Sequence, residues 1–216
     1  MKTFLIIAFT LISLNIFATS QFPDRIIYKG EKYALNCNPL EDFFNNNLGK
    51  RPNKGSFCTG LLRGYVGTFE ISDNQLLLKD IEIIVPDTLN KKTDVKSVSV
   101  IKEIFPTQDI INVDWFSGLL VIPYGKVVNY VHMGYASTYE NYYLLEINKG
   151  KLIKERKLNS KQYDQFRENQ FQAFKKTNEY KKQKEELQKS KKYSDDFIDS
   201  FLKSFFIQYT TKILPE

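Results

Sequence analysis

The sequence contains very few of the side chains from which metal centres and nucleophilic active sites are usually built. Its 216 residues include one histidine, two cysteines and one tryptophan. No HExxH or CxxC motif occurs, so the usual spacing of zinc ligands is missing. The GxSxG, Walker A, GxGxxG and EF-hand signatures are missing too. The standard hydrolase, nucleotide, zinc and calcium sites are therefore excluded by motif, and we expect no metal and no cofactor.

Long apolar runs are also scarce, and the one that stands out lies at the start of the chain. Lys2 precedes the mostly apolar stretch Phe4–Phe17, which is followed by the small residues Ala18-Thr19-Ser20. This order is typical of a secretory signal peptide, and the apolar run is shorter than the roughly 20 residues of a membrane span. The sequence predicts that residues 1–20 are removed near Ser20/Gln21 and that the mature chain is periplasmic or secreted.

Export changes the interpretation of the two cysteines. In an oxidising compartment Cys37 and Cys58 are expected to form a disulfide bridge. A bridge closing a loop of this length would stabilise the fold by on the order of 3 kcal/mol. Two buried free thiols are the alternative, and the sequence leaves it open.

The positive charge is concentrated in one segment. The net charge is +6, and residues 151–192 hold fourteen basic side chains against six acidic ones. Lys175/Glu179 and Lys181/Glu185 are among several opposite charges four residues apart, as on a solvated helix. This pattern favours a solvated face over contact with an anionic membrane surface through the Lys-rich helix. Because the chain is expected to be exported, nucleic acid is not an expected partner.

The middle of the chain has the alternation and turn residues of a sheet. Arg25–Leu35 is expected to form a hairpin around Lys29-Gly30, and Thr59–Ile71 and Gln75–Val85 are expected to be strands. Further strands are predicted at the segments Val95–Ile104, Ile110–Trp115, Gly118–Tyr124, Lys126–Met133, Tyr142–Ile147 and Lys151–Lys157. A turn is expected at Tyr124-Gly125. Because short turns rather than helices separate these segments, the pattern favours an antiparallel meander.

Two helices are predicted after the strands. Ser160–Lys191 has apolar residues at helical spacing, and Ser194 is a good N-cap for a final apolar helix that extends to about Ile213. The predicted fold class is therefore α+β: a curved antiparallel sheet of about seven to nine strands packed with two C-terminal helices. Residues 21–216 are expected to form a single domain, with 21–158 mainly β and 160–213 helical.

The candidate site lies in the aromatic stretch Asp114–Ile147, which holds the histidine, the tryptophan and six of the thirteen tyrosines. His132 is the one candidate for a catalytic residue, as a general acid or base among tyrosines. The mixture of Tyr, Ser, Thr and Asn in 134–143 is typical of binding loops, which selects the binding candidates Tyr135, Tyr139, Asn141, Tyr142 and His132. The alternatives are a structural histidine and tyrosines that simply border the core.

Several strings in the chain resemble an uncharacterised family of exported bacterial proteins of Bacteroidetes-like origin. They are NPLEDFF, RGYVGTFEISDNQLLLKDIEI, the stretch from Asp114 to Ile147, and FIDSFL. The family often has Trp before Arg-Gly-Tyr, where this chain has Leu62. The resemblance covers nearly the whole mature chain and implies export and single-domain behaviour, but no activity.

From these observations we expect an exported soluble protein that is not an enzyme and that binds a partner, such as another protein. The alternative is a hydrolase or isomerase with a motif-free site in which His132 acts with Asp114 or Tyr130. The two hypotheses predict different surroundings for His132: the enzyme needs a cleft beside it, whereas a histidine sealed in the core away from any cleft would rule the enzyme out.

Overall fold

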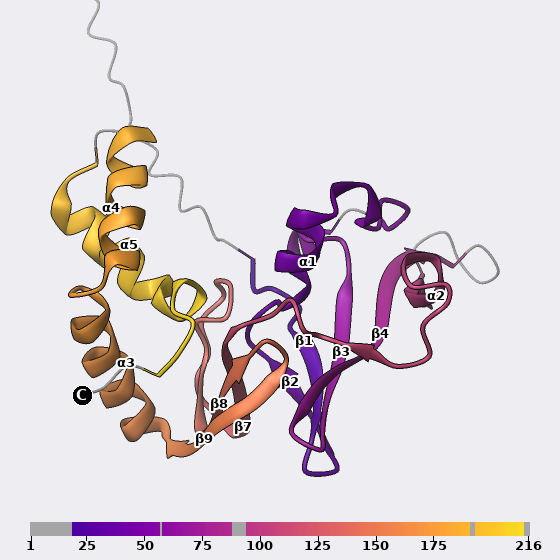
Figure 1. The fold of residues 1–216 in the computed structure, drawn as a ribbon, viewed down its shortest axis with the longest axis horizontal. Coiled ribbons are helices and arrows are strands. Elements are labelled where there is room, and N and C mark those ends of the chain that lie inside the picture. Colours follow the sequence, from indigo (N-terminus) through magenta and orange to yellow (C-terminus); the bar gives the residue numbers. More distant parts are fainter. Residues whose placement is uncertain (1–18, 57, 88–93, 191–192, 214–216) are drawn as a thin grey trace, which may run out of the picture.

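The computed structural model describes residues 19–56, 58–87, 94–190 and 193–213 and shows an α+β fold, as predicted. The expected signal peptide, residues 1–20, lies outside the described residues except for its last two. Nine strands form one curved, open sheet, and helices pack against it at two places (Figure 1). No helix in the described ranges combines the length and the apolar character needed to cross a membrane.

The strands follow the order β2-β1-β3-β4-β9-β8-β7, with β5 and β6 also paired to β4. Their bounds are β1 Asp24–Tyr28, β2 Glu31–Leu35, β3 Val66–Ser72, β4 Gln75–Pro86, β5 Val95–Ser99, β6 Ile111–Asn112, β7 Gly118–Asn129, β8 Thr138–Asn148 and β9 Lys151–Asn159. All pairings are antiparallel except that of β1 with β3, so the sheet is mixed. This parallel pair arises because the chain leaves β2 and passes through a helix at Leu40–Asn46 and two 3₁₀ turns before it returns beside β1.

The sheet consists of two halves that face each other. The β2-β1-β3-β4 half meets the β9-β8-β7 half through a single residue pair, Gln75 and Lys151. At the opposite side the Asn36 N–H donates to the carbonyl of Val121, with an N–O distance of 2.9 Å. The two edges of the open sheet are therefore brought together around a common interior.

Buried side chains form two apolar clusters on opposite faces of β7 and β8. Leu120 and Ile122 of β7 belong to the inner cluster, which lies between the two halves of the sheet. The alternate residues Leu119 and Val121 belong to the outer cluster, which lies beneath the C-terminal helices. Since both faces of the first half of β7 are buried, the sequence from Gly118 to Pro123 is a continuous apolar run rather than an alternating one.

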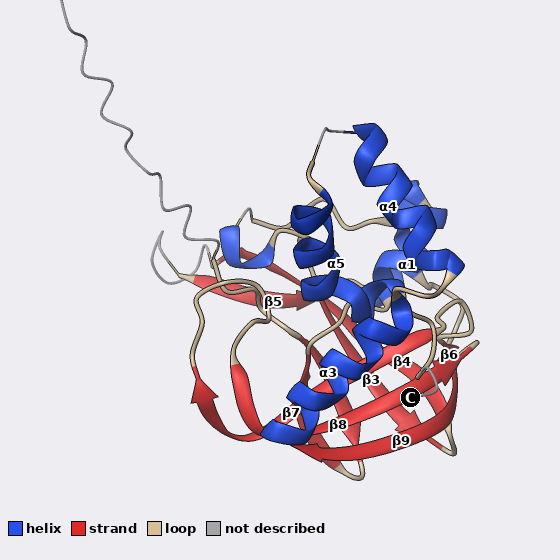
Figure 2. Cartoon of the chain, turned by 90° about the vertical axis from the view of Figure 1, so that its left-hand side faces the viewer, coloured by secondary structure: helices blue, strands red, loops and turns tan. Residues whose placement is uncertain are grey.

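The helices cover the ends and the outer face of this sheet. Their bounds are α1 Leu40–Asn46, α2 Ile101–Ile104, α3 Ser160–Phe174, α4 Asn178–Ser190 and α5 Asp195–Tyr209, with 3₁₀ turns η1 Leu48–Lys50 and η2 Thr59–Leu61. Helix α3 crosses the outer face of the β7-β8-β9 half (Figure 2). Ser194 caps α5 as predicted, accepting a hydrogen bond from the Phe197 N–H at 3.3 Å.

Three helices rather than two follow the sheet, because the long predicted helix is interrupted. The Thr177 hydroxyl accepts the Tyr180 N–H at 3.1 Å and donates to the Phe174 carbonyl at 2.7 Å. A threonine in this position ends one helix and caps the next. The Lys-rich segment is consequently a separate helix, α4, and Lys175 pairs with Asp199 at 2.6 Å rather than with Glu179.

Several local predictions in the sheet were wrong. The loop expected at 134–143 is a loop only up to Ser137, because strand β8 already begins at Thr138. The strand expected from Thr59 begins only at Val66, because residues 59–61 form the 3₁₀ turn η2. The strand expected up to Ile104 ends at Ser99 and is followed by the short helix α2. Tyr124-Gly125 is not a turn but a bulge within the long strand β7, where the pairing with β8 shifts register. Gly125 adopts a φ of +83°, which a bulge tolerates best in glycine.

Candidate functional site

A cavity of 810 Å³ lies where the two halves of the sheet meet the C-terminal helices. Its walls come from the segment that follows β2, from the β7–β8 loop at residues 133–138, and from α3 and α5. We call it the sheet–helix cavity. Its volume is in the range of small-molecule sites, and its lining combines apolar and aromatic side chains with a few charged groups.

The inner end of the cavity is built on a buried ion pair. Arg63 lines the cavity, and its Nη2 donates to Oδ1 of Asp24 at 2.9 Å, with only 8% and 0% of the two side chains exposed. The same Oδ1 accepts the Gly67 N–H at 2.8 Å, whereas Oδ2 of Asp24 and Nε of Arg63 have no partner among the described residues. Burial raises the pKa of Asp24 to about 6, although Arg63 opposes this effect.

A second ion pair neutralises another arginine in the wall. Arg51 forms two parallel hydrogen bonds of 2.9 Å to the carboxylate of Glu41, the bidentate geometry that holds such pairs most firmly. The hydroxyl of Tyr65 also donates to Glu41 at 2.7 Å. Burial raises the pKa of Glu41, but these hydrogen bonds outweigh it and the net pKa lies below the usual value. Both partners are therefore charged and committed to each other.

The predicted binding residue Tyr135 joins the β7–β8 loop to this polar end. Its hydroxyl donates to Oδ1 of Asn38 at 2.9 Å and accepts from Arg63 Nη1 at 3.3 Å. Burial raises the pKa of Tyr135 to about 12, so the hydroxyl keeps its proton at neutral pH. Asn38 and Tyr135 both line the cavity and offer neutral hydrogen-bonding groups to a ligand.

The outer wall of the cavity is aromatic. Tyr142 of β8 stacks on Tyr163 of α3 with ring centroids 3.9 Å apart, and both residues line the cavity. Phe205 and Ile207 of α5 lie on the same wall, and Phe205 is 41% exposed. Arg167, one turn after Tyr163, adds a positive charge here.

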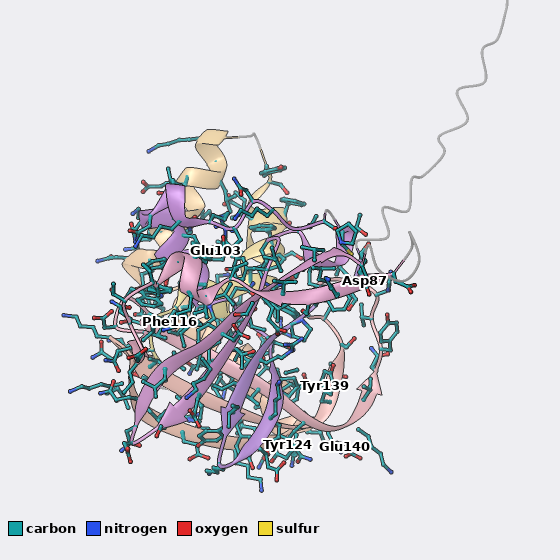
Figure 3. The ribbon with its side chains drawn as sticks, turned by 90° about the vertical axis from the view of Figure 1, so that its right-hand side faces the viewer. Asp87, Glu103, Phe116, Tyr124, Tyr139 and Glu140 are labelled. Carbon is teal, nitrogen blue, oxygen red and sulfur yellow. The ribbon has the colours of Figure 1, made fainter. Side chains whose placement is uncertain are left out.

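The other predicted binding residues lie away from the cavity wall. Tyr139 packs against the outer cluster, and Asn141 pairs within the sheet with Tyr124 and Asn159. Tyr124, Tyr139 and Glu140 lie toward one end of the molecule, away from Glu103 and Asp87 (Figure 3). The structure thus brings Tyr135 and Tyr142 to the cavity but not Tyr139 or Asn141.

His132 is exposed and does not line the cavity. Its Nδ1 lies 2.9 Å from the Tyr130 hydroxyl, which is its one polar contact within the described ranges. A general base needs a partner that orients it and a pocket that holds the substrate beside it. This position supplies the phenolic neighbour, but His132 is not part of the wall of the sheet–helix cavity, and Asp114 is an exposed residue that does not contact it.

The two cysteines are free thiols in the structure, so the expected bridge between Cys37 and Cys58 is not formed. Cys37 follows β2 and is 7% exposed, within the inner cluster. Burial raises the pKa of its thiol well above the usual value, as does the nearby Asp24 carboxylate. Cys58 is half-buried just before the 3₁₀ turn η2.

The residues that build the polar end were not singled out as site candidates, although the sequence holds a signal for them. Asp24 is in phase with Ile26 and Tyr28 on the buried face of β1, and Arg63 precedes the buried Tyr65 by two residues. A charged residue in phase with core residues needs a partner. Two such residues of opposite charge indicate a buried ion pair. Because Asp24 and Arg63 are 39 positions apart in the chain, only the tertiary structure shows that they contact each other.

Among the residues that the structure describes, no group of three or more His, Cys, Asp or Glu side chains is arranged to hold a metal ion. The cavity instead offers arginines, hydroxyls and amides, which bind organic or anionic ligands. Searches found no family model, no curated protein and no solved structure that matches this chain.

Proposed function

We propose that the mature chain is an exported, non-enzymatic binding protein that holds a small molecule in the sheet–helix cavity. The observation that carries this proposal is the cavity itself, 810 Å³ in volume and lined by aromatic, amide and arginine side chains. Sites of this size and composition bury most of a small ligand's surface. The exposed position of His132, outside the wall of this cavity, favours binding over catalysis.

A small ligand fits this geometry better than the protein partner that the composition of the β7–β8 loop suggests. Most of the aromatic side chains of that region point inward: Tyr142 is 2% exposed, and the hydroxyl of Tyr135 is tied to Asn38. A flat interface needs aromatic anchors on its outer surface. A concave site that already holds its polar groups in place is instead preorganised for a small ligand.

The cavity can be tested with a neutral fluorescent probe, phenylnaphthylamine, which brightens in apolar sites. We expect saturable binding to the full mature chain with one probe per molecule. Ser204→Trp places a large side chain in the cavity wall and should abolish this binding. Ser200→Trp, one turn earlier on the same exposed side of α5 and outside the cavity, is the matched control and should bind as wild type does. Equal binding by both variants would refute the cavity as the site.

Export is supported by the order of residues at the start of the chain and by the resemblance to exported bacterial proteins. Beside the expected cleavage point, the Gln21 N–H donates to the carbonyl of Gly134 at 3.2 Å, and the Phe22 N–H donates to Gly60 at 2.7 Å. A mature chain that begins at Gln21 keeps these contacts. The mass of the protein recovered from the periplasm or medium of a bacterial host should correspond to residues 21–216. Recovery of the uncut chain in the cytoplasm would contradict export.

A further inference from the structure

Three arginines line the sheet–helix cavity, and two of them are neutralised inside the protein. Arg51 is held by Glu41 and Arg63 by Asp24, each through hydrogen bonds of 2.9 Å. These pairs leave little net charge at the inner end of the cavity. The third, Arg167, determines the charge that the cavity presents to a ligand.

Arg167 is half-buried in the wall and makes no ion pair or hydrogen bond within the described part of the chain. The acidic residues beside it on α3 do not neutralise it. Glu168 pairs with Lys203 of α5 at 2.6 Å, and Asp164, one turn earlier, is exposed. A guanidinium that is partly removed from water without a partner is unfavourable unless an anion accompanies it. The position therefore favours a bound anion.

The surfaces around Arg167 are apolar. Its neighbours in the wall are the stacked rings of Tyr142 and Tyr163, and Phe205 and Ile207 come from α5. The hydroxyl of Tyr142 already accepts the Tyr139 N–H at 2.8 Å. A ligand at this position contacts the guanidinium of Arg167, which has no ion-pair partner among the described residues, and an aromatic surface. These two features together favour a ligand with an anionic group attached to an apolar body.

We infer that the cavity binds a small organic anion, with its carboxylate, sulfonate or phosphate group at Arg167 and its apolar body against Tyr142, Tyr163 and Phe205. This inference rests on the proposed binding function, because it assigns the ligand class of the same cavity. At the inner end the Tyr135 hydroxyl contacts Asn38 through its Oδ1 only, so the side-chain N–H groups of Asn38 can donate to the far end of the ligand.

Two fluorescent probes of nearly the same shape distinguish the contribution of the negative charge to the affinity from that of the apolar body. Anilinonaphthalene sulfonate carries one negative charge, and phenylnaphthylamine is the same ring system without it. A charge-assisted hydrogen bond to a partly buried arginine corresponds to a gain of about tenfold or more in affinity. Fluorescence titration of the full mature chain should therefore give a dissociation constant for the sulfonate that is at least about tenfold lower.

The variant Arg167→Gln should remove that difference and leave the affinity for the neutral probe unchanged. Retained binding of the neutral probe shows that the variant is folded and that its cavity is intact. Lys161→Gln is the matched control, since it removes one positive charge from an exposed position of the same helix. It should keep the wild-type preference for the sulfonate.

Each outcome is decisive. Equal affinities of the wild-type protein for the two probes would overturn the anion inference and leave the binding function standing. A preference for the sulfonate that survives in Arg167→Gln would overturn the role of Arg167. If neither probe binds the wild-type protein, the proposed function fails together with the inference. If Arg167→Gln does not fold, the comparison of the two probes on the wild-type protein still decides the ligand class.

Discussion

Replacing Asp24 by asparagine should change how the stability of the protein depends on pH. Asp24 is fully buried, and its neighbours are the guanidinium of Arg63, the N–H of Gly67 and, further away, the carboxylate of Glu41. Asparagine has the same shape and keeps an oxygen that can accept from Gly67 and Arg63. The substitution therefore removes a titrating group while it preserves most of the local hydrogen bonding.

The size of this pH effect follows from the difference between the pKa of Asp24 in the folded chain and its pKa in the unfolded chain. Burial raises the pKa of Asp24 from 3.8 to about 6, so the folded chain holds this proton more tightly than the unfolded chain. The contribution of this group to stability is fully present below pH 3.8 and is lost as the pH rises through 6. Between pH 5 and pH 7 the loss is on the order of 1 kcal/mol.

The assay is urea unfolding of the wild-type and Asp24→Asn proteins at pH 5 and at pH 7. All other titratable groups are present in both proteins. The difference between the unfolding free energies of the wild type and of Asp24→Asn therefore changes with pH only because of Asp24. At each pH we compare the unfolding free energy of Asp24→Asn with that of the wild type. The value for the variant minus the value for the wild type should be larger at pH 7 than at pH 5, by on the order of 1 kcal/mol. The sign follows because only the wild type loses stability from Asp24 as the pH rises.

A matched control is Asp73→Asn, at an exposed turn position with a φ of +48° that asparagine also tolerates. This variant should differ from wild type by the same amount at both pH values. If Asp24→Asn also shows no change between pH 5 and pH 7, Asp24 does not titrate in this range in the folded protein. The account of the buried pair with Arg63 would then be wrong.

Two further predictions concern packing and the thiols. Phe174→Ala should destabilise the protein by about 3–5 kcal/mol in urea unfolding, because this ring is fully buried in the outer cluster. Phe197→Ala, at a ring that is 49% exposed, should have an effect below about 1 kcal/mol. Equal losses would contradict the burial of Phe174 in the outer cluster. Mass spectrometry after alkylation in denaturant without reductant should find Cys37 and Cys58 both modified, and in the folded protein Cys37 should react more slowly because it is buried with a raised pKa. An unmodified pair would show a disulfide instead.

Local patterns in the sequence predicted many of the elements correctly. The hairpin at Lys29-Gly30 was predicted and is present, and both residues have the positive φ of a type I′ turn. The N-cap at Ser194 was likewise predicted and is present. These features depend on residues within a few positions of each other, so the order of residues is enough to define them.

The errors arose where a local pattern was compatible with two structures. A glycine after a tyrosine at 124–125 signals either a turn or a bulge, and only the partner strand β8 decides between them. The apolar residues keep their helical spacing across Thr177, although the helix itself is interrupted there. The interruption depends on the hydrogen bond from the Tyr180 N–H to the Thr177 hydroxyl. In both cases the deciding contact is a specific hydrogen bond or strand pairing, which periodicity does not report.

By itself the sequence determined the α+β class, the approximate positions of the strands and the region from which Tyr135 and Tyr142 come. It did so because alternation, caps and turn residues act over short distances. The tertiary structure alone decided that β1 lies parallel to β3, that Asp24 meets Arg63, and that α3 brings Arg167 to the wall of the sheet–helix cavity. These contacts join segments far apart in the chain, and they depend on strand order and on how the helices pack across the sheet, which no local pattern encodes.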